Sequence, residues 1–267
     1  MNKPLTIKNT HNRLFRRNQN MPDQDFDEYL KDDSTFPVVS ADNSKPKSGQ
    51  DKFLMDGNKM LWHLDRFEQW KKGEKFAPIH IDAGLSKGCN IQCHYCYGVT
   101  QGNFYRASAK KIFERDALIN NYMKSAGEVG VRSIAFIGEA EPTMNPHLYE
   151  AVVVGKKSGI DISIGTNGVL FDTRKRGKAA LEHLSWIRFN ISAASDESYR
   201  KIHASKEFDT VVEKVKFCVK YKREKNLDLT IGLQMVLTPK DVAEVVLLLA
   251  RLGKEIEVNY FQVKHCR

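Results

Sequence analysis

From about residue 78 onward, short apolar segments alternate with longer amphipathic ones. The short segments are rich in β-branched residues and predict buried strands, whereas the longer ones carry apolar residues at helical spacing. The predicted strands are 79–86, 132–138, 161–168, 186–192, 229–238 and 257–264. The predicted helices are 108–126, 146–159, 173–184, 207–224 and 239–253.

This alternation over short loops predicts parallel β/α units with right-handed crossovers. Six such units suit either an open doubly wound sheet or a partial barrel. In both architectures the ligand site lies at the carboxyl ends of the strands. The sequence shows no internal repeat beyond the β/α unit.

Three regions are expected along the chain. Residues 1–52 are polar and indicate a partly disordered, basic extension. Residues 53–77 contain a predicted helix that packs on the main domain through apolar residues at helical spacing: Met60, Leu61, Leu64, Phe67 and Trp70. Residues 78–267 form the predicted core domain, which ends after its sixth strand and so lacks a last helix, as in a truncated or a divergent short member.

Composition narrows the class of protein. The chain has 267 residues, of which 41% are apolar and 28% charged, which is typical of a soluble globular protein. The apolar stretch 242–250 is too short to span a membrane, and the first residues contain no signal-peptide pattern. We therefore expect no membrane association.

The formal charge of +9 is partly concentrated at the start of the chain. Five basic residues precede the first acid, Asp23: Lys3, Lys8, Arg13, Arg16 and Arg17. This arm suits a nucleic acid or another polyanion, but a solvated tail or an organelle-targeting segment explains it as well.

Three of the five cysteines lie in the segment "SKGCNIQCHYCYG" (86–98). An odd number of cysteines with a cluster of three argues against a disulfide framework and for a reducing compartment, which we take to be the cytoplasm. The clustered residues are Cys89, Cys93 and Cys96, with C-x3-C-x2-C spacing.

Three thiolates at this spacing suit zinc or an iron–sulfur cluster. A structural zinc site needs a fourth protein ligand, for which His94 is poorly placed. Cys218 falls on a predicted helix, so only Cys266 remains. A [4Fe–4S] cluster held by three thiolates instead leaves one iron open, as a catalytic centre requires.

This loop, placed after a first strand, resembles the signature of radical S-adenosylmethionine (SAM) enzymes. The resemblance implies a partial (β/α)6 barrel with an N-terminal extension, and as cofactors a [4Fe–4S] cluster and SAM. In that family the cluster reductively cleaves SAM to a 5′-deoxyadenosyl radical, which abstracts hydrogen from the substrate. It also implies an oxidoreductase supplied with electrons by flavodoxin or ferredoxin.

Other segments carry the same resemblance. Tyr95 fills the aromatic position before the third cysteine, near the adenine in the family. The segment "IGEAEPTMNP" (137–146) is similar to the family's G-x-G-E-P-T version of the segment that binds the SAM amino group, and it keeps Gly138 and Glu141. Ala140 replaces a glycine there, and Glu139 precedes it. Glu141 could also cap the helix that begins near Pro146.

The ends of the third and fourth strands complete the resemblance. The pair Thr166 and Asn167 in "IGTNGVL" and Ser192 in "FNIS" are implied contacts of SAM. The Asn-Gly pair is equally an ordinary turn, and Ser192 an ordinary strand-end residue. Lys206 is the implied partner of the SAM carboxylate. Gln234 and Met235 are expected to point at adenine or substrate.

The predicted function is reductive SAM cleavage followed by hydrogen abstraction from a peptide or a small metabolite. One alternative is a radical SAM enzyme that modifies RNA, which the basic arm leaves open. The other is a non-catalytic binding module in which metal only staples the fold.

Overall fold

The computed structural model describes residues 63–97, 113–138, 140–238 and 243–266. Six parallel strands form one sheet in the order β1 to β6, each paired with the next strand in sequence. The strands are β1 His80–Ala83, β2 Ser133–Phe136, β3 Asp161–Thr166, β4 Leu184–Asn190, β5 Thr230–Leu237 and β6 Tyr260–His265. Because no further described strand pairs with β1 or β6, the predicted partial barrel is confirmed as an open, curved α/β sheet.

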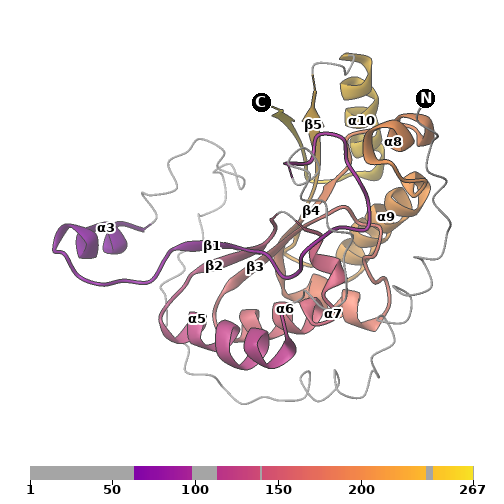
Figure 1. Cartoon of the computed structure of the whole chain (residues 1–267). Helices are drawn as coiled ribbons and strands as arrows, with labels where there is room; N and C mark the ends of the chain where they lie inside the picture. Colours follow the sequence, from indigo (N-terminus) through magenta and orange to yellow (C-terminus); the bar gives the residue numbers. More distant parts are fainter. Residues whose placement is uncertain (1–62, 98–112, 139, 239–242, 267) are drawn as a thin grey trace, which may run out of the picture.

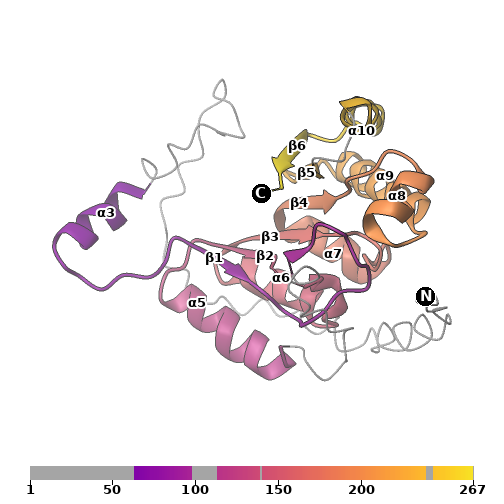
Figure 2. The same cartoon turned by 45° about the horizontal axis from the view of Figure 1, so that its top comes forward.

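Helices follow the strands and cover one face of the sheet (Figures 1 and 2). The connection from β1 to β2 ends in a π-helical stretch, η2, which continues into a short α-helix. The helical elements are η2 Ala117–Met123, α5 Lys124–Glu128, the 3-10 turn η3 Pro142–Met144, α6 Leu148–Lys157, α7 Lys175–His183, α8 Asp196–His203, α9 Phe208–Glu224 and α10 Ala243–Ile256.

The hydrophobic core lies between the sheet and these helices. Alternate strand residues face the helices, and the register aligns them across the sheet, as Ile164 with Ile187 and Phe189 with Leu233. These side chains are at most 1% exposed. The intervening residues face the concave side, which we call the lumen, and include Ser163, Gly165, Trp186, Arg188, Asn190, Gly232, Gln234, Val236, Tyr260, Gln262 and Lys264. The lumen therefore carries polar and charged side chains, in contrast to the core.

The predicted elements are found at their expected places, with ends that differ by a few residues in either direction, apart from one helix. The sequence between Ser192 and residue 207 predicted no helix, yet α8 lies there. It begins at Ser195, whose hydroxyl accepts the Ser198 N–H while the Ser198 hydroxyl accepts the Ser195 N–H. This reciprocal cap satisfies donors that would otherwise be unpaired at the helix start.

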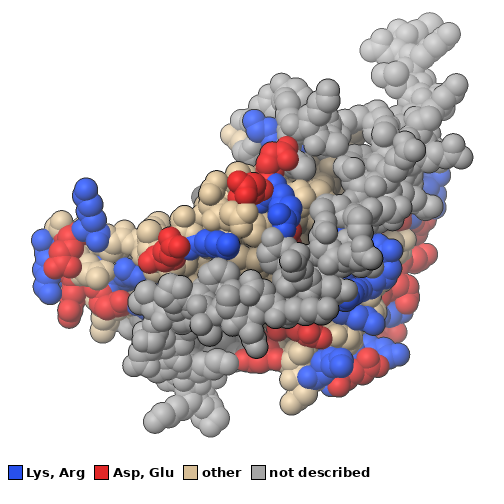
Figure 3. Space-filling model, turned by 90° about the horizontal axis from the view of Figure 1, so that it is seen from below, with Lys and Arg blue, Asp and Glu red and all other residues tan. Residues whose placement is uncertain are grey.

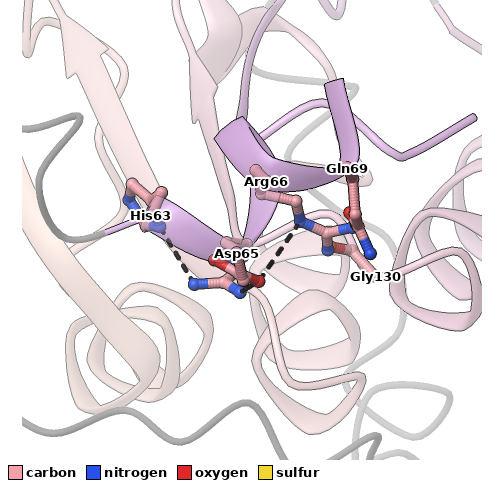
Figure 4. A network of polar contacts seen from close by, with 6 residues as sticks. His63, Asp65, Arg66, Gln69 and Gly130 are labelled. Carbon is pink, nitrogen blue, oxygen red and sulfur yellow. Dashed lines mark hydrogen bonds and ion pairs between the residues drawn. The ribbon is translucent and has the colours of Figure 1, made fainter. Parts of the chain in front are cut away.

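The helix α3 (Leu64–Lys71) lies beside the core domain, but the prediction that its apolar face packs there is wrong. Leu64 is 55% exposed and Trp70 63% exposed. Polar contacts attach the helix instead (Figure 4). Arg66 Nη2 donates to the Gly130 carbonyl at 2.7 Å, and Arg132 donates to Asp65 at 2.5 Å.

Basic and acidic side chains are intermixed over the described part of the surface seen in Figure 3. None of the described helices is long and apolar enough to cross a bilayer. The polar extension 1–52, its basic arm, Met60, Leu61 and Glu139 lie outside the described residues.

Candidate functional site

The three cysteines lie in the loop that follows β1, at the carboxyl end of the sheet. Two backbone hydrogen bonds attach this loop to the end of α8, from Gln92 N–H to the His203 carbonyl at 3.1 Å and from His94 N–H to the Ile202 carbonyl at 2.9 Å. Within the loop, Cys96 N–H donates to the Cys93 carbonyl at 3.0 Å. The loop is therefore anchored by a helix more than a hundred residues away in sequence.

Cys93 is hydrogen-bonded to a buried histidine. The His203 ring is 0% exposed, and its Nδ1 lies 3.0 Å from Cys93 Sγ. Its Nε2 accepts the Ser192 backbone N–H at 3.0 Å, so the ring proton is on Nδ1 and is donated to the sulfur. Burial lowers the pKa of His203 to about 3, which keeps the ring neutral.

Two asparagines surround Cys89. Asn167 Nδ2 lies 3.4 Å from Cys89 Sγ and 2.8 Å from Asn90 Oδ1. The buried Asn90 Nδ2 has no hydrogen-bond partner among the described residues. A buried donor without a partner is costly unless a further acceptor is bound beside it.

Glu141 joins the ends of β2 and β3. Its carboxylate, 3% exposed, accepts from the hydroxyls of Thr143 and Thr166 at 2.6 Å each, from Thr143 N–H at 3.0 Å and from Asn167 N–H at 2.8 Å. Glu141 caps the 3-10 turn η3, whereas the prediction allowed for a cap of the helix near Pro146. Burial raises the pKa of its carboxyl, and these four donors oppose that rise.

Tyr95 connects the cysteine loop to β4. Its hydroxyl lies 2.9 Å from Ser192 Oγ and accepts from Asn190 Nδ2 at 2.9 Å. Asn190 Oδ1 in turn accepts from Gln234 Nε2 at 3.0 Å. A continuous chain of hydrogen bonds thus leads from the cysteine loop into the lumen.

The structure brings most of the predicted site residues together at this edge: Cys89, Cys93, Cys96, Tyr95, Gly138, Glu141, Thr166, Asn167 and Ser192. Gly138 has a φ of 148°, which residues with a side chain rarely adopt, so the backbone conformation at the end of β2 favours glycine. Lys206 is exposed between α8 and α9, and no hydrogen bond or ion pair joins it to these described residues. Gln234 faces the lumen, but Met235 is buried in the core, so its expected direction is wrong.

The arrangement of the cysteines fits a cubane cluster better than a zinc ion. All five cysteines are free thiols, and no three Cys, His, Asp or Glu side chains of the described residues converge on one metal position. A tetrahedral zinc needs such convergence, whereas each thiolate of a cubane binds a different iron. Cys218 is fully buried in α9, as predicted, and Cys266 lies just after β6. The unpartnered Asn90 donor is consistent with a missing acceptor beside Cys89.

The Cys89 and Cys93 thiols are partly buried. Burial raises the pKa of Cys93 to about 12, and burial together with the nearby Glu141 carboxylate raises the pKa of Cys89 further. Binding of a metal centre therefore has to displace protons from both thiols.

Sequence reasoning missed three contributors: His203, Asn90 and Asn190. Asn90 lies inside the quoted cysteine segment, so its position alone could have suggested it. His203 carried a weaker signal, since the Ser195 cap and the acids Asp196 and Glu197 could have predicted a helix ending near it.

Comparison with sequence families and curated proteins gives a consistent result. The family model described as the Radical SAM superfamily matches residues 85–249. A protein of Saccharolobus solfataricus named "Probable GTP 3′,8-cyclase" is 31% identical over 158 residues, which cover 58% of this chain and 46% of that protein. A protein of the same name from Thermococcus kodakarensis is 25% identical over 154 residues, covering 57% and 47%. The chain spans about half the length of the curated relatives it matches.

Solved structures share the fold. Streptococcus suis SuiB bound to the precursor peptide SuiA gives a TM-score of 0.60 at 15% identity, over 96% of this chain and 52% of that one. Native anSMEcpe with bound AdoMet gives 0.51 at 22% identity, over 70% and 51%. The family model covers more than half of this chain, including the cysteine loop and the four strands β2 to β5. The chain therefore belongs to the radical SAM superfamily, whose cofactors are a [4Fe–4S] cluster and SAM.

Proposed function

We propose that Cys89, Cys93 and Cys96 bind the cluster and that this chain cleaves SAM reductively to start hydrogen abstraction from a substrate in the lumen. The observation that carries this proposal is the cysteine loop at the end of β1, facing the buried polar side chains that end β3 and β4. When bound, the reduced cluster supplies the electron that splits SAM into methionine and a 5′-deoxyadenosyl radical.

The protein's own part at the cluster is to hold the thiolates and screen them from water. The N–H of His203 donates to Cys93, and the amide of Asn167 donates to Cys89. Both hydrogen bonds stabilise negative charge on sulfur. Tyr95, held by Ser192 and Asn190, closes the side of the loop that faces the lumen.

The SAM contacts rest on unused hydrogen-bonding capacity. Among the described residues, Glu141 Oε2 accepts only from Asn167 N–H, so it can also accept from an ammonium group. Ser192 Oγ accepts the Val236 N–H at 3.0 Å and lies 2.9 Å from the Tyr95 hydroxyl. With Tyr95 as the donor of that hydrogen bond, the Ser192 proton is available for a ligand. Thr166, Asn167 and Gly138 shape the same edge. Lys206 is kept in the proposal as the partner of the SAM carboxylate, and what supports this role is its long, exposed side chain.

The substrate is proposed to be a small metabolite. The relatives named "Probable GTP 3′,8-cyclase" support a small molecule, while the peptide bound to SuiB keeps a peptide as the alternative. The proposal includes oxidoreductase chemistry in the cytoplasm with flavodoxin or ferredoxin as the electron donor. RNA modification would depend on the basic arm, which lies outside the described residues.

The test is anaerobic reconstitution with iron and sulfide, followed by dithionite and SAM, with 5′-deoxyadenosine as the measured product. We expect its formation by the wild-type chain and by Cys218→Ala, because Cys218 lies in the core and not in the loop. Cys93→Ala should lower the rate to background because a ligand is lost. Bound zinc in place of iron, with no 5′-deoxyadenosine, would favour the stapled binding module instead.

A further inference from the structure

Among the described residues, Arg188 is a lumen-facing cation without a paired counter-charge. It is half-buried on β4, and no ion pair among the described residues involves it. Its contacts are all neutral: Nη1 donates to Gln262 Oε1 at 3.3 Å, the Tyr260 phenol interacts with the guanidinium, and the guanidinium carbon lies 5.4 Å from the centre of the Trp186 ring. Burying a guanidinium beside neutral groups alone is unfavourable unless an anion binds there.

A second cation lies on the same lumen-facing side of the sheet. Lys264 follows Gln262 by two residues on β6, so both side chains face the lumen. Burial lowers the pKa of Lys264, and the positive charge of Arg188 lowers it further. The opposing acid is Asp82 on β1, which is exposed and lies 2.9 Å from His80 Nε2. Two cations therefore face one carboxylate that already has a partner.

An unpartnered acceptor lies between the two cations. Gln234 is 8% exposed, and its Oε1 has no hydrogen-bond partner among the described residues. The strand register aligns Gln234 with Asn190 on one side and with Gln262 on the other. Because its Nε2 donates to Asn190, the side chain is held with the free oxygen in the lumen. Such an oxygen is available to accept from a donor on a ligand.

Glycines on the neighbouring strands allow the groups around Arg188 to pack closely. Gly165 and Gly232 are the register partners of Arg188 on either side. A Cβ at Gly165 would lie 2.6 Å from Ile137 Cγ2, and one at Gly232 would overlap the Tyr260 ring that interacts with the guanidinium. A side chain at Gly232 would therefore displace a neighbour of Arg188.

The position of Arg188 separates it from the SAM contacts. Ser192 lies four residues after Arg188 along the same chain, which corresponds to roughly 13 Å at the usual rise of a strand. Arg188 thus lies deeper in the lumen than the edge that carries Glu141, Thr166 and Asn167. Lys264 is aligned with Val236, whose N–H donates to Ser192 Oγ, so the subsite extends from Arg188 up to the level of Ser192.

We propose that Arg188, Lys264 and Gln234 form a substrate subsite for a small molecule that carries an oxyanion, a phosphate or a carboxylate, beside a hydrogen-bond donor. The planar guanidinium can bind two oxygens of such a group at once, and Gln234 Oε1 accepts from the adjacent donor. This subsite rests on the proposed function, because it assigns the substrate class of the same lumen.

The test measures anion binding to the reconstituted holoprotein with SAM present, by isothermal titration calorimetry. The probes are inorganic pyrophosphate for phosphate esters and succinate for carboxylates. We expect Arg188→Gln to bind the preferred probe at least tenfold more weakly, and Arg188→Lys to recover part of the affinity because it keeps the charge. The matched control is Arg251→Gln on α10, which removes an exposed arginine and should leave binding unchanged.

A loss with pyrophosphate alone would assign the subsite to a phosphate ester, and a loss with succinate alone to a carboxylate. The inference is overturned if the wild-type chain binds neither probe, if Arg188→Gln binds as well as wild type, or if Arg251→Gln loses as much affinity. Wild-type 5′-deoxyadenosine formation in the same preparation separates the two proposals. Product without anion binding rejects only the subsite, whereas no product rejects the proposed function.

Discussion

His203 shows how a contact distant in sequence can tune a local motif. Its N–H points at Cys93 Sγ while Ser192 N–H fixes the other ring nitrogen, so the donor has one direction. A hydrogen bond to a thiolate ligand favours the more negative, reduced state of a cluster. The residue is 110 positions from Cys93, so no motif around the cysteines could have indicated it.

His203→Leu should shift the midpoint potential of the reconstituted cluster downward by about 50 mV, the equivalent of about 1 kcal/mol for one electron. EPR-monitored redox titration measures it. His203→Asn is the matched variant, since its amide N–H can replace Nδ1–H and should restore most of the potential. Equal potentials in wild type and His203→Leu would contradict the assignment, because a purely structural role predicts altered stability without a shift.

The remaining site residues differ in how far the sequence could predict them. Cys89, Cys93 and Cys96 are contiguous in a loop, so their spacing alone indicated the chemistry. Glu141 was also predicted, but its four protein donors emerge only when β2 and β3 end side by side. Arg188 could not be singled out from the sequence, where it is one residue of a predicted strand. That no described carboxylate pairs with it becomes visible only when the side chains that line the lumen are known.

At the scale of elements, strand positions were predictable because buried parallel strands are continuous apolar runs. The face that a helix buries, and what it packs against, were harder to predict from the sequence. The apolar spacing of α3 predicted packing, yet polar contacts of Arg66 and Arg132 attach it. The helix α8 was missed because its few apolar residues, Tyr199 and Ile202 among them, give little periodicity over eight residues.

Close backbone packing at α7 gives a prediction for stability. A Cβ at Gly177 would overlap the Asp172 carbonyl oxygen, and a backbone atom cannot move aside as a flexible side chain can. Gly177→Ala should lower the free energy of unfolding by about 1–3 kcal/mol, as measured by urea denaturation.

Gly253→Ala in α10 is the matched control for this change. Its added Cβ would meet Val258 Cγ2 at 3.3 Å and Leu233 Cδ1 at 3.4 Å, both methyl groups that can adjust. Because alanine favours a helix over glycine, the change in unfolding free energy should stay below about 1 kcal/mol. Equal effects of the two substitutions would show that backbone crowding at Gly177 is not limiting.

At the scale of the whole molecule, the core and the cysteine loop occupy different places. The core fills the space between the sheet and helices α6, α7 and α9, where side chains such as Val153, Ile162 and Val215 are at most 1% exposed. The loop lies at the carboxyl edge and is attached mainly to the end of α8. Folding of the sheet therefore has little need of a metal, in contrast to small metal-stapled domains.

We expect the metal-free protein, prepared by chelation under anaerobic conditions, to keep its far-UV circular dichroism and one cooperative thermal transition. Its midpoint should be lower than that of the holoprotein only by the amount that cofactor binding contributes. Cys89→Ala, Cys93→Ala and Cys96→Ala should behave alike, each folded but without iron, because each removes one ligand and none removes core contacts. Unfolding of these variants together with the chelated protein would instead mean that the cysteines hold the fold, as in a stapled binding module. Since a catalytic cluster needs a scaffold that is already folded around an open iron, retained structure with lost SAM cleavage is the combination that separates the enzyme from the module.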